Sequence, residues 1–117
     1  MKNQIKVLGI ILFLLFPMLF FISCNPSDKN TTKNTHSVDT VVIKQMQFFP
    51  ADLNVKIGDT VVWINNDMVP HTVKESEAKG FYSDTINVGK SWKTEVKDSA
   101  SYICSIHPTM VGKLVLK

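Results

Sequence analysis

The 117-residue sequence contains no arginine, and all thirteen of its basic side chains are lysines. Four of these lysines precede residue 36, and from His36 onward nine lysines are balanced by nine acidic residues. Arginine supplies the forked contacts to phosphates and base edges that nucleic-acid-binding proteins favour, usually on a strongly basic surface. The chain therefore predicts no nucleic-acid partner.

Only one long apolar run occurs, the sixteen uncharged residues 7–22, and Pro17 interrupts it. A membrane-spanning helix needs about 20 apolar residues, so this run is short for one. It follows two lysines and ends on the small side chains of Ser23 and Cys24, as a secretory signal peptide does. The sequence therefore predicts an exported protein.

The residues Phe21-Ile22-Ser23-Cys24 resemble the cleavage box of bacterial lipoprotein signals, in which the cysteine becomes the lipidated first residue of the mature chain. Phe21 is a departure, because leucine is commoner there. The resemblance implies a signal peptide over residues 1–23, a lipid on Cys24, and a location in the bacterial cell envelope, facing the periplasm or the cell surface. The alternative is an uncleaved N-terminal anchor.

Large apolar residues are missing from residues 25–37, which are polar and predicted to be disordered. Together with Cys24 they form a predicted linker, residues 24–37, in which His36 is expected to be exposed. Thirteen such residues span on the order of 20 Å. This length would hold a small domain off a membrane surface while leaving it free to reorient.

Cysteine is scarce, with Cys24 and Cys104 the only two. Two cysteines in an exported protein would ordinarily suggest a disulfide. If Cys24 carries lipid, however, Cys104 is a lone thiol in an oxidising compartment, where an unprotected thiol is liable to oxidation. Coordination to a metal ion would explain its persistence, and a disulfide between the two cysteines is the alternative.

No stretch after the apolar run shows a helical period of ten residues. From residue 38 onward the pattern is one of short runs rich in β-branched and aromatic residues, separated by turn-forming residues. The expected runs are 41–49, 53–57, 60–64, 81–88, 92–96, 101–104 and 113–117, with a polar exposed loop at 75–80. Seven or eight strands at this spacing predict a single all-β domain, a β-sandwich over residues 38–117.

Three potential metal ligands lie within seven residues of one another, at Cys104, His107 and Met110. A thiolate, two imidazoles and a weak axial thioether form the donor set of blue-copper electron-transfer sites. That set needs a second imidazole, and only two other histidines exist, His36 and His71. His71 lies at the start of an apolar run, so the predicted site is His71, Cys104, His107 and Met110.

Two further methionines, Met46 and Met68, are possible thioether ligands in place of Met110. Met46 lies in a strand pattern and is expected to line the core instead. Zinc is the alternative metal, since imidazole and thiolate bind it well, although a thioether would be an unusual zinc ligand.

Three segments, Gly58–Asn65, Pro70–Val73 and Tyr102–Gly112, resemble the small cupredoxins, and most closely their plastocyanin and amicyanin branch. The resemblance extends over residues 41–117, nearly the whole predicted domain. It implies a Greek-key sandwich of about eight strands with one type 1 copper ion at one end.

Carried over by position, the resemblance implies a role for each predicted site residue. His71 and His107 would be the equatorial imidazoles, and Cys104 would be the thiolate. Met110 would be the axial thioether.

The chain departs in three places from the branch that it resembles, one of which is the absence of the glycine usual just before Tyr102, where Asp98-Ser99-Ala100-Ser101 stands instead. Ile106 precedes His107 where proline is usual, and Thr72 follows His71 where amicyanin-like proteins carry an asparagine that braces the ligand loop. No implied ligand is lost, but these changes leave the rigidity of the loop and the reduction potential open.

The resemblance implies a carrier of single electrons between redox protein partners, held at a membrane by its lipid and acting as a monomer. Neither a small-molecule substrate nor enzymatic activity is expected. A copper storage or delivery module is the alternative, but it would prefer an open site rich in methionine or histidine, and the chain lacks a methionine-rich tract. A copper-enzyme subunit would need another metal centre, for which too few histidine, cysteine and acidic residues remain.

Overall fold

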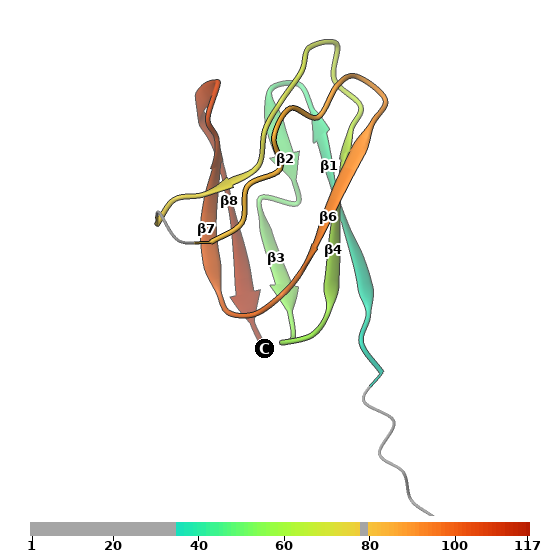
Figure 1. Cartoon of the computed structure of the whole chain (residues 1–117), viewed down its shortest axis with the longest axis vertical. Helices are drawn as coiled ribbons and strands as arrows, with labels where there is room; N and C mark the ends of the chain where they lie inside the picture. The colour runs from blue at the N-terminus through green and yellow to red at the C-terminus, as the bar shows by residue number, and fades with distance from the viewer. Residues whose placement is uncertain (1–34, 78–79) are drawn as a thin grey trace, which may run out of the picture. The chain divides into compact units, whose positions relative to one another are not determined.

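The computed structural model describes residues 35–77 and 80–117, which belong to one compact unit and form two sheets (Figure 1). Its strands are β1 (Val38–Lys44), β2 (Gln47–Phe49), β3 (Asp52–Val55), β4 (Thr60–Asn65), β5 (Lys74–Glu75), β6 (Ser91–Glu95), β7 (Ala100–Cys104) and β8 (His107–Leu116). This sandwich confirms the predicted all-β fold class. The predicted signal peptide, Cys24 and most of the predicted linker lie outside the described residues. Among the residues described, no helix has the length and apolar character needed to cross a membrane.

The first sheet has the strand order β2-β1-β4-β6, with β1 and β4 parallel and the other pairs antiparallel. Side chains alternate along β4, so that Val61, Trp63 and Asn65 are buried while the residues between them are partly exposed. A period of two is what a sheet with one buried face requires. Val38 of β1 pairs with Thr60 of β4, and we call this end of the sandwich, where both strands begin, the base.

The second sheet has the strand order β3-β8-β7-β5, with β3 and β8 parallel. β7 buries Tyr102 and Cys104 on its inner face, and β8 buries Met110 and Leu114. The last residues of β8 pair with β3 just before the chain enters β4 at the base. The first residue of β8, His107, therefore lies at the opposite end of the sandwich.

Aromatic side chains from both sheets meet in the core. Trp63 and Tyr102 pack edge to face with their ring centroids 5.4 Å apart, and Phe48 packs against Tyr102 at 5.0 Å. Such arrangements stabilise aromatic pairs beyond the burial of their area. Gly112 of β8 provides the room, because a Cβ atom there would overlap the Tyr102 ring. Burial raises the pKa of Tyr102 to about 12, so its phenol stays neutral.

The predicted single strand over residues 41–49 is wrong, because the chain turns at Gln45 and Met46 between β1 and β2. Both residues have positive φ, 53° and 59°, in a two-residue hairpin turn that usually selects glycine, asparagine or aspartate. Glutamine and methionine give no such signal, which explains the error. Met46, predicted to line the core, is 41% exposed.

Two other boundaries also differ from the prediction. β8 begins at His107 rather than at residue 113, since pairing with β7 resumes directly after the hairpin turn. Within the described residues 80–117, the segment 81–88 contains isolated bridges in place of the predicted strand, one of which joins Ile86 to His71. Through this bridge, segment 81–88 is attached to the end of the sandwich opposite the base.

Ser37 holds the N-terminal end of the described chain at the base. Its backbone N–H donates to Asp59 Oδ1 at 2.8 Å, and its carbonyl accepts the Thr60 N–H at 2.9 Å. The second carboxylate oxygen of Asp59 accepts the Lys56 N–H at 2.8 Å. The N–H groups of Ser37 and Lys56 hold the pKa of Asp59 below its ordinary value of 3.8. His36 is exposed, as predicted.

Because the pKa of Asp59 is lowered in the folded state, its ionised form stabilises the fold above the ordinary value of 3.8, and this contribution is lost as the pH falls through the folded-state value. We expect the Asp59→Asn variant to be less stable than the natural chain at neutral pH, and the difference to narrow below about pH 4. Urea unfolding at a series of pH values measures this difference. The exposed Asp52 provides the control, Asp52→Asn. A difference that stays constant with pH would contradict the assignment.

Candidate metal centre

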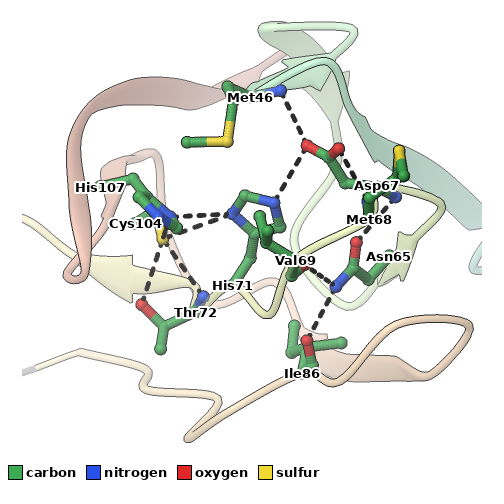
Figure 2. Close-up of polar contacts among 10 residues, drawn as sticks. All are labelled: Met46, Asn65, Asp67, Met68, Val69, His71, Thr72, Ile86, Cys104 and His107. Atoms are coloured by element: carbon green, nitrogen blue, oxygen red, sulfur yellow. Dashed lines mark hydrogen bonds and ion pairs between the residues drawn. The ribbon is translucent and has the colours of Figure 1, made fainter.

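Three donor atoms from distant parts of the chain meet at the end of the sandwich opposite the base (Figure 2). Cys104 Sγ lies 3.8 Å from His71 Nδ1 and 3.7 Å from His107 Nδ1, and the two nitrogens are 3.3 Å apart. A point in the plane of these atoms lies about 2.1 Å from each, the length of an ordinary bond from a metal ion to imidazole or thiolate. The arrangement therefore suits one metal ion among three donors.

The β7–β8 hairpin fixes two of these donors. Cys104 ends β7 and His107 begins β8, and the two residues pair across a turn made of Ser105 and Ile106. Directly opposed residues of antiparallel strands have Cβ atoms about 5 Å apart. The spacing of cysteine and histidine in the sequence therefore corresponds to a two-residue turn that directs both side chains to one space.

Burial differs among the predicted site residues. His71 and Cys104 are fully buried, which shields the sulfur from solvent, whereas His107 is half-buried. Met110 is buried on β8 and belongs to the same apolar cluster as Cys104. His107 is therefore the donor through which the centre is accessible from the surface.

The orientation of His71 is set by Asp67, whose Oδ2 lies 3.1 Å from His71 Nε2. The backbone N–H groups of Met46 and Met68 each donate to this carboxylate at 2.8 Å, and they hold the pKa of Asp67 below its ordinary value. An ionised carboxylate only accepts hydrogen bonds, so His71 Nε2 carries the proton and donates it. The lone pair of Nδ1 then faces Cys104 and His107, as a metal ligand requires.

Asn65, the last residue of β4, fixes the loop that carries Asp67 and His71. Its side-chain Nδ2 donates to the carbonyls of Val69 and Ile86, both at 2.9 Å, and its Oδ1 accepts the Asp67 N–H at 2.9 Å (Figure 2). Asn65 is fully buried, so these bonds replace water as its partners. The loop is thus held from inside the protein.

Thr72 connects the His71 segment to the hairpin. Its backbone N–H donates to Cys104 Sγ at 3.3 Å, and its Oγ1 accepts the Ser105 N–H at 2.8 Å. The threonine that stands where the resembling proteins carry asparagine therefore braces the ligand loop as well.

Sequence analysis did not identify Asn65 or Asp67 as residues of the site. A carboxylate four positions before a predicted ligand histidine is the signal that could have found Asp67. Asn65 gave no such signal, because its role depends on carbonyls at Val69 and Ile86 that only the fold brings together.

Two imidazoles and one thiolate in a triangle are the donor set of blue-copper centres. Copper accepts both the soft sulfur and the borderline nitrogens, and such a site serves both of its oxidation states. The residues present therefore fit a copper ion. Together, the sandwich and this donor set define a copper protein of the cupredoxin class.

Residues 35–117 match the family described as copper binding proteins, plastocyanin/azurin family. The chain belongs to this family. Proteins of the family are electron carriers and not enzymes. The family therefore confirms the predicted cofactor, one type 1 copper ion, and the prediction that the chain is not an enzyme.

Known relatives and structures agree with this assignment. The chain is 31% identical over 83 residues to amicyanin-alpha of Methylorubrum extorquens, covering 66% of this chain and 70% of the relative. It is 34% identical over 85 residues to amicyanin of Paracoccus denitrificans, covering 66% of this chain and 63% of the relative. A purple cupredoxin from Nitrosopumilus maritimus superposes with a TM-score of 0.63 at 24% identity, over 68% of this chain and 99% of that one, and shares the fold.

Removing the carboxylate of Asp67 should weaken metal binding, because His71 would lose the acceptor that fixes its ring and tautomer. We expect the Asp67→Ala variant to bind Zn²⁺, used as a probe, on the order of 10- to 100-fold more weakly than the natural chain. Asp67→Asn should lose less, since its amide oxygen still accepts a hydrogen bond. Titration against a competing chelator measures the affinity, and Asp98→Ala, at an exposed carboxylate, is the control. Equal affinities for the natural chain and Asp67→Ala would contradict this role.

Proposed function

We propose that His71, Cys104, His107 and Met110 bind the copper ion and that the chain uses it to pass single electrons between redox proteins. The observation that carries this proposal is the triangle of 3.3–3.8 Å formed by Cys104 Sγ and the two Nδ1 atoms. Those donors come from two segments that the fold brings together, as a preformed site requires. Copper bound there would supply the one-electron change.

The fixed frame around the donors favours fast electron transfer. Cys104 is paired into the hairpin, His71 is held by Asp67, and Thr72 joins the two segments. A site that barely rearranges between oxidation states costs little reorganisation, and near-trigonal donors with a weak axial ligand serve both Cu(I) and Cu(II). The buried Met110 is the proposed axial thioether.

Electrons would enter and leave through the half-buried edge of His107. Apolar side chains surround this end: Met68 is 91% exposed, Ile106 is 52% exposed, and Pro70 and Pro108 are also exposed. A small apolar surface of this kind suits the brief encounters of electron-transfer partners, whose interfaces are at the small end of the range. We therefore assign docking of the redox partner to this end.

The proposed location is the bacterial cell envelope, with the chain acting as a monomer anchored by lipid on Cys24 and facing the periplasm or the cell surface. The signal-like residues 1–23 and the polar residues 24–37 support it. Copper storage or delivery is less favoured, because a buried cysteine and histidine held by hydrogen bonds do not form the open site that rapid metal exchange needs.

The visible spectrum of the copper-loaded chain tests the ligand set. The natural chain with Cu(II) should show an intense charge-transfer band from the thiolate, which makes such proteins blue, and Cys104→Ser should abolish it. His36→Ala is the matched control, since this exposed histidine lies at the base and should leave the band unchanged. A colourless Cu(II) form of the natural chain would reject the proposed site.

The role of Met110 has a separate test. Met110→Leu removes the thioether while nearly conserving volume, so the fold should be retained. The blue band should persist, because the three closer donors remain, and the reduction potential should rise, because the axial ligand tunes it and its loss favours Cu(I). Voltammetry measures the potential. An unchanged potential would show that Met110 is not the axial ligand.

A further inference from the structure

The hydroxyl group of Thr72 lies among three polar atoms of the hairpin. Its Oγ1 is 2.8 Å from the Ser105 nitrogen, 2.9 Å from Ser105 Oγ and 3.7 Å from Cys104 Sγ. Thr72 is almost fully buried, so water does not compete for these contacts. Figure 2 shows both Thr72 contacts to the sulfur, one from the backbone nitrogen and one from the side-chain oxygen.

The protons available decide the direction of these hydrogen bonds. Thr72 Oγ1 accepts the Ser105 N–H and has one proton of its own to donate. Ser105 is exposed, so its hydroxyl can donate to Thr72 Oγ1 and accept from water. With Ser105 as the donor, the Thr72 proton is free for the sulfur at 3.7 Å, which as a thiolate is a charged acceptor.

We propose that Thr72 is a positioning residue whose hydroxyl tunes how strongly the Cys104 sulfur donates to the metal. The sulfur then accepts two hydrogen bonds from this one residue, from the backbone N–H at 3.3 Å and from the hydroxyl at 3.7 Å. The same oxygen holds the turn residue Ser105 against the His71 segment. This inference rests on the copper ligand set proposed above.

The consequence for the redox centre follows from the charge on the sulfur. A hydrogen bond to the thiolate stabilises its lone pairs and weakens their donation to the metal. Weaker donation stabilises Cu(II) less and so favours the reduced form. It also raises the energy of charge transfer from sulfur to Cu(II). The Thr72 hydroxyl should therefore raise the potential and move the blue band to shorter wavelength.

The experiment compares three variants of the full copper-loaded chain. Thr72→Val removes the hydroxyl but keeps the shape and the backbone N–H. Thr72→Ser keeps the hydroxyl, and Ser105→Ala removes the outer hydroxyl while keeping the N–H that Thr72 accepts. Voltammetry gives the equilibrium constant for reduction, and the visible spectrum gives the position of the band.

We expect the equilibrium constant for reduction of the copper centre to be about tenfold smaller in Thr72→Val than in the natural chain. For one electron this lowers the reduction potential by about 59 mV, and the blue band should move to longer wavelength. Thr72→Ser and Ser105→Ala should remain within about threefold of the natural chain, because both keep the hydrogen bond to sulfur. The proposal is overturned if Thr72→Val has the same potential and band position as the natural chain. It is also overturned if the potential of Thr72→Ser shifts as far as that of Thr72→Val.

Two further observations separate the possible failures. Loss of the blue band in the natural chain would reject the ligand set itself, whereas a blue natural chain with an unshifted Thr72→Val would reject only the role of Thr72. Should Thr72→Val fail to fold, hydrogen exchange of the Ser105 amide in the natural chain decides. Slow exchange is expected from its bond to Thr72 Oγ1, and exchange at the rate of an open turn would overturn the proposal.

Discussion

Cys104 and His107 face each other across a turn of only two residues, and the site depends on this constraint. The strands on either side belong to the second sheet, and the pairing of Cys104 with His107 across the turn holds the two donors together, although the register of β7 and β8 shifts between Ile103 and Cys104. The third donor has no such support from a strand of its own. His71 lies outside the named strands, and its position is secured by two backbone hydrogen bonds with Ile86 and by the side chains around it.

Those side chains form a continuous set of hydrogen bonds around His71. Asn65 holds the loop, and Asp67 orients the imidazole. Thr72, the residue after His71, is hydrogen-bonded to the hairpin turn at Ser105. Asp67 also accepts the N–H of Met46, so the strained turn between β1 and β2 is tied to the same carboxylate. The sandwich thus rigidifies the strands, while polar groups rigidify the one loop that the metal needs.

The sequence was sufficient to identify the fold class and the three donors that the fold brings together. Cys104 and His107 fell in one short stretch with Met110, the proposed fourth ligand, and the short histidine list left His71 as the partner. The turn at Met46 could not be predicted, because its conformation is stabilised by a carboxylate 21 residues away rather than by local preference. For the same reason the bracing by Thr72 could not be read from its neighbours, since its partner Ser105 is 33 residues away.

The N-terminal end of the described chain is held at the base through Ser37, and the three donors meet at the other end of the sandwich. Seven residues of β1 separate the two ends by roughly 20 Å, at about 3.3 Å per residue. In a chain held at a bilayer through its N-terminus, the metal centre would then lie at the end of the domain farther from the attachment, while the linker left the domain free to turn. Water-soluble partners could reach that end without competing with the lipid, whereas a partner within the same bilayer would require the domain to tip over.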